Sequence, residues 1–129
     1  MPSPRLAAAA APALCASVLA LGPAASARHA PAAPHRAAVT RVSVVAATPS
    51  EFRFKLSKRV VRRGTVVFSI RNRGALPHDF KVHGKKTKLL SPGKSATLRV
   101  VFKKAGRYPY LCTVSGHAAA GMKGVLRVR

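Results

Sequence analysis

From residue 39 onward the chain consists of short segments in which apolar residues alternate with polar or charged ones. The alternation is clearest at residues 51–56 and 95–102. A period of two places the apolar side chains on one face of a strand. Turn-forming stretches such as residues 91–94, Ser-Pro-Gly-Lys, separate the segments, and no helical period runs through them. We therefore predict an all-β domain of about seven or eight strands, an antiparallel sandwich or barrel around one modest core.

The first 38 residues have a different composition. Arg5, the Ala/Leu-rich run at residues 6–21 and the Ala25-Ser26-Ala27 triplet are typical of a secretory signal peptide covering residues 1–27. Residues 28–38, rich in Pro and Ala, are expected to form a disordered linker, which leaves residues 39–129 as the domain. We expect an exported protein that is periplasmic, attached to the cell surface or secreted. A retained membrane anchor is the less favoured alternative, since the apolar run is short.

Four side chains of this sequence are candidate metal ligands. Cys112, His117 and Met122 fall within eleven residues, and His78 lies upstream. Two histidines, one cysteine and one methionine are the donor set of a blue-copper site, with three strong ligands in a plane and a weak axial sulfur. Removal of the signal would take Cys15 with it, and Cys112 would have no disulfide partner. The alternative is an inert buried cysteine.

Several neighbouring residues have two interpretations each. Asp79 is either an acceptor for backbone N–H groups of the Cys112 loop or an ordinary turn residue, and Asn72 either bridges the site or closes a turn. Leu76 and residues 118–120 would form an apolar patch around the edge of His117, or are small residues chosen for space. His83 has the opposite strand parity to His78 and is expected at a surface turn. Most expected strands also carry outward Lys or Arg.

Three sequence patterns resemble those of the cupredoxins, the blue-copper family that includes plastocyanin and azurin. They are Asn72-x-Gly74-x-x-Pro77-His78, Gly106-x-Tyr108-x-Tyr110-x-Cys112 and Cys112-x₄-His117-x₄-Met122. The resemblance implies a Greek-key sandwich with one type 1 copper ion at one end, held by His78, Cys112, His117 and Met122. It also implies single-electron transfer. Many relatives have a proline shortly after the cysteine, where this chain has Ser115.

The charge of the chain bears on its partners. Lys and Arg number 24 and Asp and Glu only 2, a formal net charge of +22. Such a surface attracts acidic proteins, anionic lipids or polyanions, or serves only to keep the protein soluble. We predict a monomeric electron carrier, not an enzyme, whose redox partner has an acidic docking surface, with an anionic membrane surface as a further partner. Specific nucleic-acid binding is not expected, because stacking aromatics are lacking on a basic face. The alternatives are a protein that buffers or delivers copper, and a basic module for polyanions.

Overall fold

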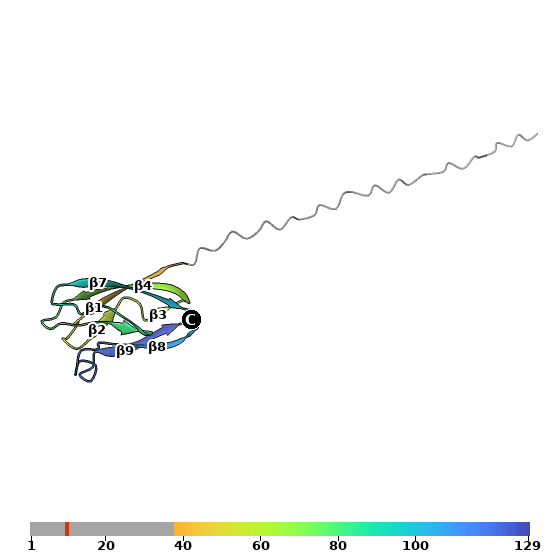
Figure 1. Cartoon of the computed structure of the whole chain (residues 1–129). Coiled ribbons are helices and arrows are strands. Elements are labelled where there is room, and N and C mark those ends of the chain that lie inside the picture. Colours follow the sequence, from red (N-terminus) through yellow and green to blue (C-terminus); the bar gives the residue numbers. More distant parts are fainter. Residues whose placement is uncertain (1–9, 11–37) are drawn as a thin grey trace, which may run out of the picture. The chain divides into compact units, whose positions relative to one another are not determined.

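The computed structural model describes residue 10 and residues 38–129. The predicted signal peptide and linker therefore lie outside the described residues, apart from Ala10 and Ala38. The same holds for Cys15 of the signal peptide and for the two histidines of the linker, His29 and His35. Within the described part the chain forms strands and no helix (Figure 1). No helix in that part has the length and apolarity needed to cross a membrane. The strands are β1 (Thr40–Ala46), β2 (Phe54–Leu56), β3 (Val60–Val61), β4 (Gly64–Asn72), β5 (Lys81–Val82), β6 (Lys85–Lys86), β7 (Ser95–Phe102), β8 (Gly106–Leu111) and β9 (Lys123–Val128).

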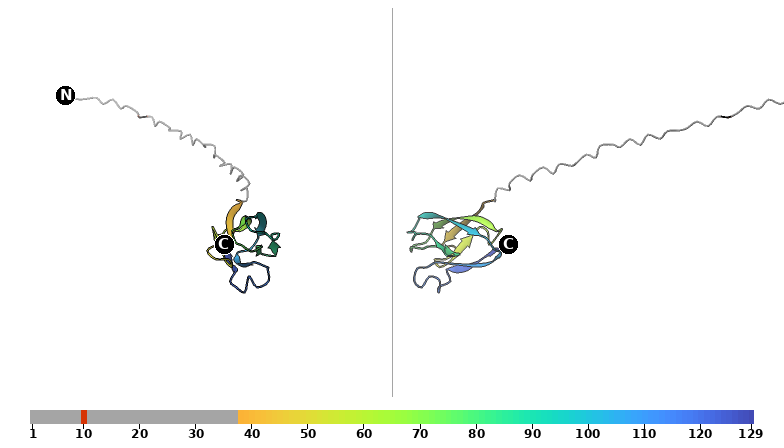
Figure 2. Two further views of the ribbon diagram at one scale, coloured as in Figure 1. Left: turned by 90° about the vertical axis from the view of Figure 1, so that its left-hand side faces the viewer. Right: turned by 45° about the vertical axis from the view of Figure 1, so that its right-hand side comes forward.

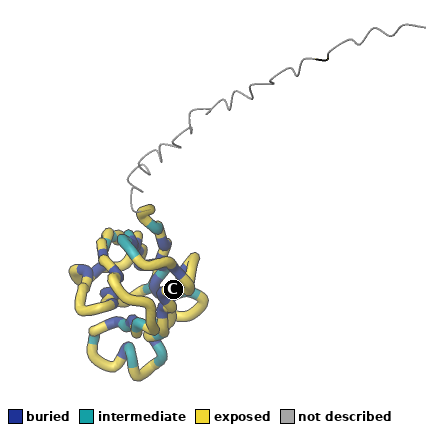
Figure 3. Tube along the Cα trace, turned by 90° about the vertical axis from the view of Figure 1, so that its right-hand side faces the viewer, coloured by how far each residue is buried: buried dark blue, intermediate teal, exposed yellow. Residues whose placement is uncertain are grey.

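The strands form two sheets that face each other across one core (Figure 2). The first sheet has the order β2-β1-β4-β7 and the second the order β3-β9-β8-β5-β6. Buried and exposed residues alternate along the long strands, as in β4 and β9. Figure 3 shows how buried and exposed positions are distributed along the chain. The predicted all-β sandwich is confirmed.

Two details of the predicted sandwich are wrong. It has nine strands, because β3, β5 and β6 are pairs of residues too short to show a period of two. The sheets are mixed and not purely antiparallel, since β1 runs parallel to β4 and β3 runs parallel to β9. The parallel pairs arise because β2 ends at the edge of the first sheet and the chain crosses to the second sheet before β4 returns.

The segment predicted as a strand over residues 51–56 is also shorter in the structure. Only Phe54–Leu56 is strand, whereas Glu51 and Phe52 lie in a turn. The backbone N–H of Arg53 donates to the carbonyl of Ser50 at 3.1 Å and closes this turn. The turn removes Glu51 from the strand and brings it to one end of the sandwich.

The core is centred on Phe80, which is fully buried. Its ring lies 5.2 Å from that of Phe54 and 5.4 Å from that of Phe68, both in the first sheet, and 5.5 Å from that of Tyr110 in the second. Aromatic pairs at such separations add to the stability that apolar burial supplies. Since Phe80 follows His78 by two residues, the core fixes the chain close to a predicted ligand.

Candidate metal centre

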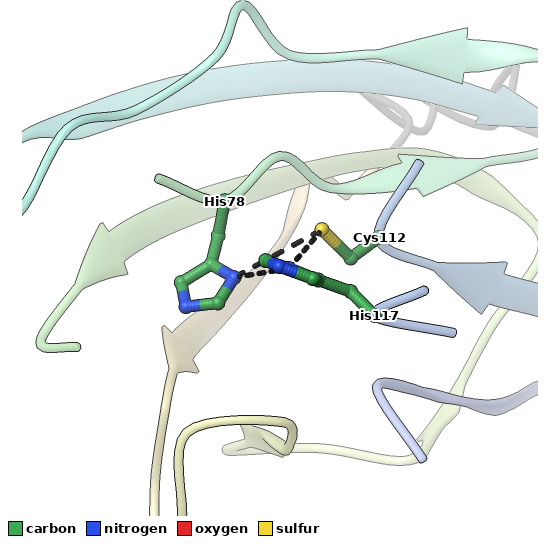
Figure 4. Close-up of side chains that lie close together, drawn as sticks. All are labelled: His78, Cys112 and His117. Atoms are coloured by element: carbon green, nitrogen blue, oxygen red, sulfur yellow. Dashed lines mark hydrogen bonds between the residues drawn. The ribbon is translucent and has the colours of Figure 1, made fainter. Parts of the chain in front are cut away.

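Three of the predicted ligands lie together at one end of the sandwich (Figure 4). His78 follows the loop after β4, Cys112 directly follows β8, and His117 lies in the loop between β8 and β9. The Cys112 Sγ is 3.6 Å from His117 Nδ1 and 4.0 Å from His78 Nδ1, and the two Nδ1 atoms are 3.1 Å apart. All three side chains are buried. Both imidazoles therefore turn the same nitrogen toward the thiol.

The spacing of these atoms fits a metal ion. A point equidistant from the three donor atoms lies about 2.1 Å from each, which is the radius of the circle through a triangle of those three sides. Metal bonds to imidazole nitrogen and thiolate sulfur, as measured for zinc, are about 2.0–2.3 Å long. The three donors are therefore spaced so that they could hold one ion between them.

Backbone hydrogen bonds hold the three ligands in place. His78 forms an isolated β-bridge with Leu90, with N···O distances of 3.0 and 2.8 Å. The N–H of Cys112 donates to the carbonyl of Met122, and the N–H of Met122 donates to the carbonyl of His117, both at 3.0 Å. These bonds close the ligand loop and hold the three donor residues close together.

Met122, the predicted axial ligand, is placed beside the other three by its backbone. The two hydrogen bonds just described join it to Cys112 and His117, and its side chain is fully buried. A buried methionine whose backbone is bonded to two of the other ligands is consistent with the predicted axial role. Ligation through the Met122 sulfur stays a prediction.

Glu51 is a member of the site that the sequence did not reveal. Its Oε1 lies 2.9 Å from His78 Nε2, on the side of the ring away from the thiol. The same carboxylate accepts hydrogen bonds from the backbone N–H groups of Ala75 and Leu76, at 3.1 and 3.0 Å. A carboxylate on the outer nitrogen of a ligating histidine fixes the ring and makes it a stronger donor. One feature of the sequence could have pointed to Glu51: the chain has only two acidic residues, so each of them was a candidate for a specific role.

Gly74 makes room for this carboxylate. A Cβ at that position would collide with Glu51 and with the side chain of Ala47. The glycine of the motif before His78 therefore serves the close approach of Glu51 to the loop.

Asp79, the second acidic residue, ties the cysteine to the histidine segment. It accepts a hydrogen bond from the backbone N–H of Thr113 at 2.6 Å and another from the Thr113 hydroxyl. The prediction that Asp79 accepts a backbone N–H of the Cys112 loop is confirmed. Lys86 Nζ lies 3.6 Å from the same carboxylate.

Asn72 has both of the roles considered for it. Its Oδ1 accepts the N–H of Gly74 within a turn, and its Nδ2 donates to the carbonyls of Leu76 and Leu90, each at 2.8 Å. Since Leu90 is the bridge partner of His78, the buried Asn72 amide supports both chain segments that flank the ligand.

The protonation of the cluster follows from its burial. Burial raises the pKa of the Cys112 thiol above its usual value of 9.0. Burial, and then the neighbouring His78, lowers the pKa of His117 below 6.5. The hydrogen bonds from Leu76 and Ala75, and then His78, lower the pKa of Glu51 below 4.5. At neutral pH the ion-free site thus has a protonated thiol, a neutral His117 and an ionised Glu51.

The site reaches the surface at His117. The exposed fraction of this residue is 8%, against 1% for His78 and 1% for Cys112. Phe52 contacts its ring edge-on at 5.1 Å, Leu76 is exposed, and Ala119 and Ala120 are exposed in the same loop. His83, as predicted, lies apart at an exposed turn, where it packs on Tyr108 and Phe102.

Comparison with known families gives a match over most of the chain. A family described as "Cupredoxin-like domain" matches residues 13–128. Solved structures with a similar fold include auracyanin from Roseiflexus castenholzii, at 22% identity and a TM-score of 0.57, over 72% of this chain and 98% of that one. Rusticyanin from Thiobacillus ferrooxidans is 22% identical with a TM-score of 0.61, over 70% of this chain and 77% of that one. At these identities the likeness concerns the fold.

A curated relative matches a shorter stretch. The copper-resistant cuproprotein CopI of Pseudomonas aeruginosa is 49% identical over 41 residues, which are 32% of this chain and 23% of the relative. The match thus spans about a quarter of that protein. Taken with the family match, the cluster of His78, Cys112 and His117 fits one type 1 copper ion.

Proposed function

This chain belongs to the cupredoxin family, and on that premise we propose that it is an exported type 1 copper protein that carries single electrons. The proposed ligands are His78, Cys112 and His117, with Met122 as the axial donor. When bound, copper supplies a centre that alternates between Cu(II) and Cu(I). We propose a carrier and not an enzyme.

The observation that supports the proposal is the closely spaced, buried donor triangle. Its sides of 3.1, 3.6 and 4.0 Å are held by backbone bonds and by the Glu51 and Asp79 carboxylates. Donors that are fixed in advance need little rearrangement when the charge of an ion changes. His117, at 8% the most exposed of the three ligands, gives an electron a short path to a partner, and the apolar side chains around it allow close approach.

The test is to add Cu(II) to the purified protein and record visible and electron paramagnetic resonance spectra. We expect one equivalent of copper and an intense blue absorption, because the Cys112 thiolate is the ligand responsible for the colour. The Cys112→Ser variant, which replaces the sulfur with a hydroxyl oxygen, should lose that absorption. Blue absorption that persists in the variant would refute the assignment of Cys112.

A second function, copper buffering or delivery, is favoured by the similarity to CopI, whose name describes a copper-resistant cuproprotein. Exchange and voltammetry separate the two functions. An electron carrier keeps its copper against a modest chelator and gives a reversible one-electron wave. Rapid loss of copper to the chelator, with no reversible wave, would favour delivery.

The location and partner of the protein remain part of the proposal. The Ala25-Ser26-Ala27 triplet after an apolar run supports export. For a redox partner we propose a protein with an acidic surface, since the formal net charge of the chain is +22. Reduction of such a partner by the copper protein should slow steeply as ionic strength rises.

A further inference from the structure

A cluster of exposed positive charge lies at the end of the sandwich opposite the metal centre. We call it the basic end, and define it by the nine exposed side chains Lys58, Arg59, Arg62, Arg63, Lys103, Lys104, Arg107, Arg127 and Arg129. These residues lie after β2, around β3, between β7 and β8, and where β8 begins and β9 ends. In Figure 1 this is the end marked by the C-terminus, away from the loop between β8 and β9. The loop itself, residues 113–122, contains no charged residue.

Hydrogen bonds and strand pairing bring these cations close together. The N–H of Arg63 donates to the carbonyl of Arg129 at 3.0 Å, and the N–H of Arg127 donates to the carbonyl of Arg59 at 2.9 Å. Arg107 lies directly opposite Arg127 in the β8–β9 pair. Arg62, Arg63 and Arg129 line a surface hollow of about 570 Å³.

No acidic residue offsets this charge. The two in the chain, Glu51 and Asp79, are both at the metal centre, where they contact His78 and Lys86. Like charges directly opposite each other on adjacent strands destabilise a sheet, as Arg107 and Arg127 must. An external anionic surface would offset that cost.

Exposed apolar side chains beside the cations favour a membrane as that surface. Val60 is 43% exposed and pairs with Arg127, and Val101, 49% exposed, lies close to the end of β7. Valines beside arginines suit a lipid headgroup layer, where the apolar part of each side chain is buried and the guanidinium stays at the phosphates. A nucleic-acid surface would stack bases on exposed aromatic rings, whereas at this end Phe102 is buried and Tyr108 is half-buried against it.

We propose that the basic end binds an anionic lipid membrane. Bound in this way, the domain directs its metal centre, at the opposite end, away from the bilayer and toward partners in solution. The proposal does not depend on copper, because none of the nine cations touches the donor cluster.

The test measures sedimentation of the full chain with vesicles of phosphatidylcholine alone and with vesicles that also contain phosphatidylglycerol. One variant replaces Arg62, Arg63, Arg107 and Arg127 with glutamine. A matched control, Arg71→Gln, Arg73→Gln, Lys88→Gln and Lys94→Gln, removes the same charge from exposed positions at the metal end. Both variants keep the N-terminal residues, so the difference between them reports on the basic end. Far-UV circular dichroism verifies that both are folded.

We expect the wild-type chain to prefer anionic vesicles at about 0.15 M salt and to lose this preference at high salt. The basic-end variant should lose affinity for anionic vesicles by roughly tenfold or more, since each cation near an anionic surface contributes to binding, and the control should lose about threefold or less. Equal losses in the two variants would overturn the proposal in favour of net charge alone. Absence of a preference for anionic vesicles would also overturn it, including the case in which the chain binds a soluble polyanion or an acidic protein instead.

Discussion

Replacement of Glu51 by glutamine tests how the protein tunes its metal centre. The carboxylate accepts three hydrogen bonds, from Ala75, Leu76 and the outer nitrogen of His78. Glutamine has nearly the same shape but no charge and only one acceptor oxygen. The substitution therefore removes the charge from the hydrogen bond to His78. It also places an amide NH2 group, which cannot accept a hydrogen bond, opposite the backbone N–H of Ala75.

The size of the effect follows from the exposure of this carboxylate. A hydrogen bond to a charged group contributes about 1.5–3 kcal/mol when buried. The side chain of Glu51 is 28% exposed, so water can form some of the hydrogen bonds that the carboxylate no longer makes, and the loss of free energy is smaller. We expect the free energy of Cu(II) binding to weaken by about 1.4 kcal/mol, which is a tenfold loss of affinity. This value is at the lower end of the range for carboxylates that support a ligating histidine. If Cu(I) binding is unchanged, the reduction potential rises by about 60 mV, since a tenfold change in a one-electron couple is about 59 mV.

Voltammetry of the copper-loaded wild type and Glu51→Gln measures the potential, and competition with a chelator measures the affinity for Cu(II). Thr97→Lys is the matched control, because it adds the same unit of charge at an exposed position in β7. A Glu51→Gln potential within about 15 mV of the wild type, or one that Thr97→Lys reproduces, would refute a specific role of the contact between Glu51 and His78.

Three further predictions concern the axial ligand, the core and acid stability. Met122→Leu should keep the blue absorption and raise the potential in voltammetry, since it removes a weak sulfur donor without a change in the plane of strong ligands; loss of colour would contradict an axial role. Phe80→Ala should lower the free energy of unfolding in urea by about 3–5 kcal/mol, because a fully buried ring is removed from between the sheets, whereas a loss under about 1 kcal/mol would show that the core closes over the cavity. In the copper-free protein the pKa of Glu51 is lower when folded, so its carboxylate stabilises the fold above about pH 4.5 and this contribution is lost as pH falls through the folded pKa. Urea titrations between pH 6 and pH 3 should therefore show a smaller loss of stability in Glu51→Gln than in the wild type, and parallel curves would count against the contact.

The sequence alone was enough for the fold class and for the closely spaced donors. A period of two is a local property, so the pattern of residues 95–102 predicts both a strand and the face of that strand that is turned to the core. Cys112, His117 and Met122 are close in sequence, and the donor chemistry of their side chains is enough to identify them as candidate ligands. Asp79 was found in the same way, because it adjoins His78.

Tertiary structure decided which segments meet. The parallel pairing of β1 with β4 depends on where β2 and β3 go, and no local pattern encodes it. Glu51 is 27 residues from His78, and its alternating neighbours predicted an outward strand position until the turn at Ser50 and Arg53 placed it on the imidazole. The period of two indicates which side chains of a strand face the core. Contacts between segments that are distant in sequence form only when the sheets pack. For that reason the ligands could be predicted, and the carboxylate that supports one of them could not.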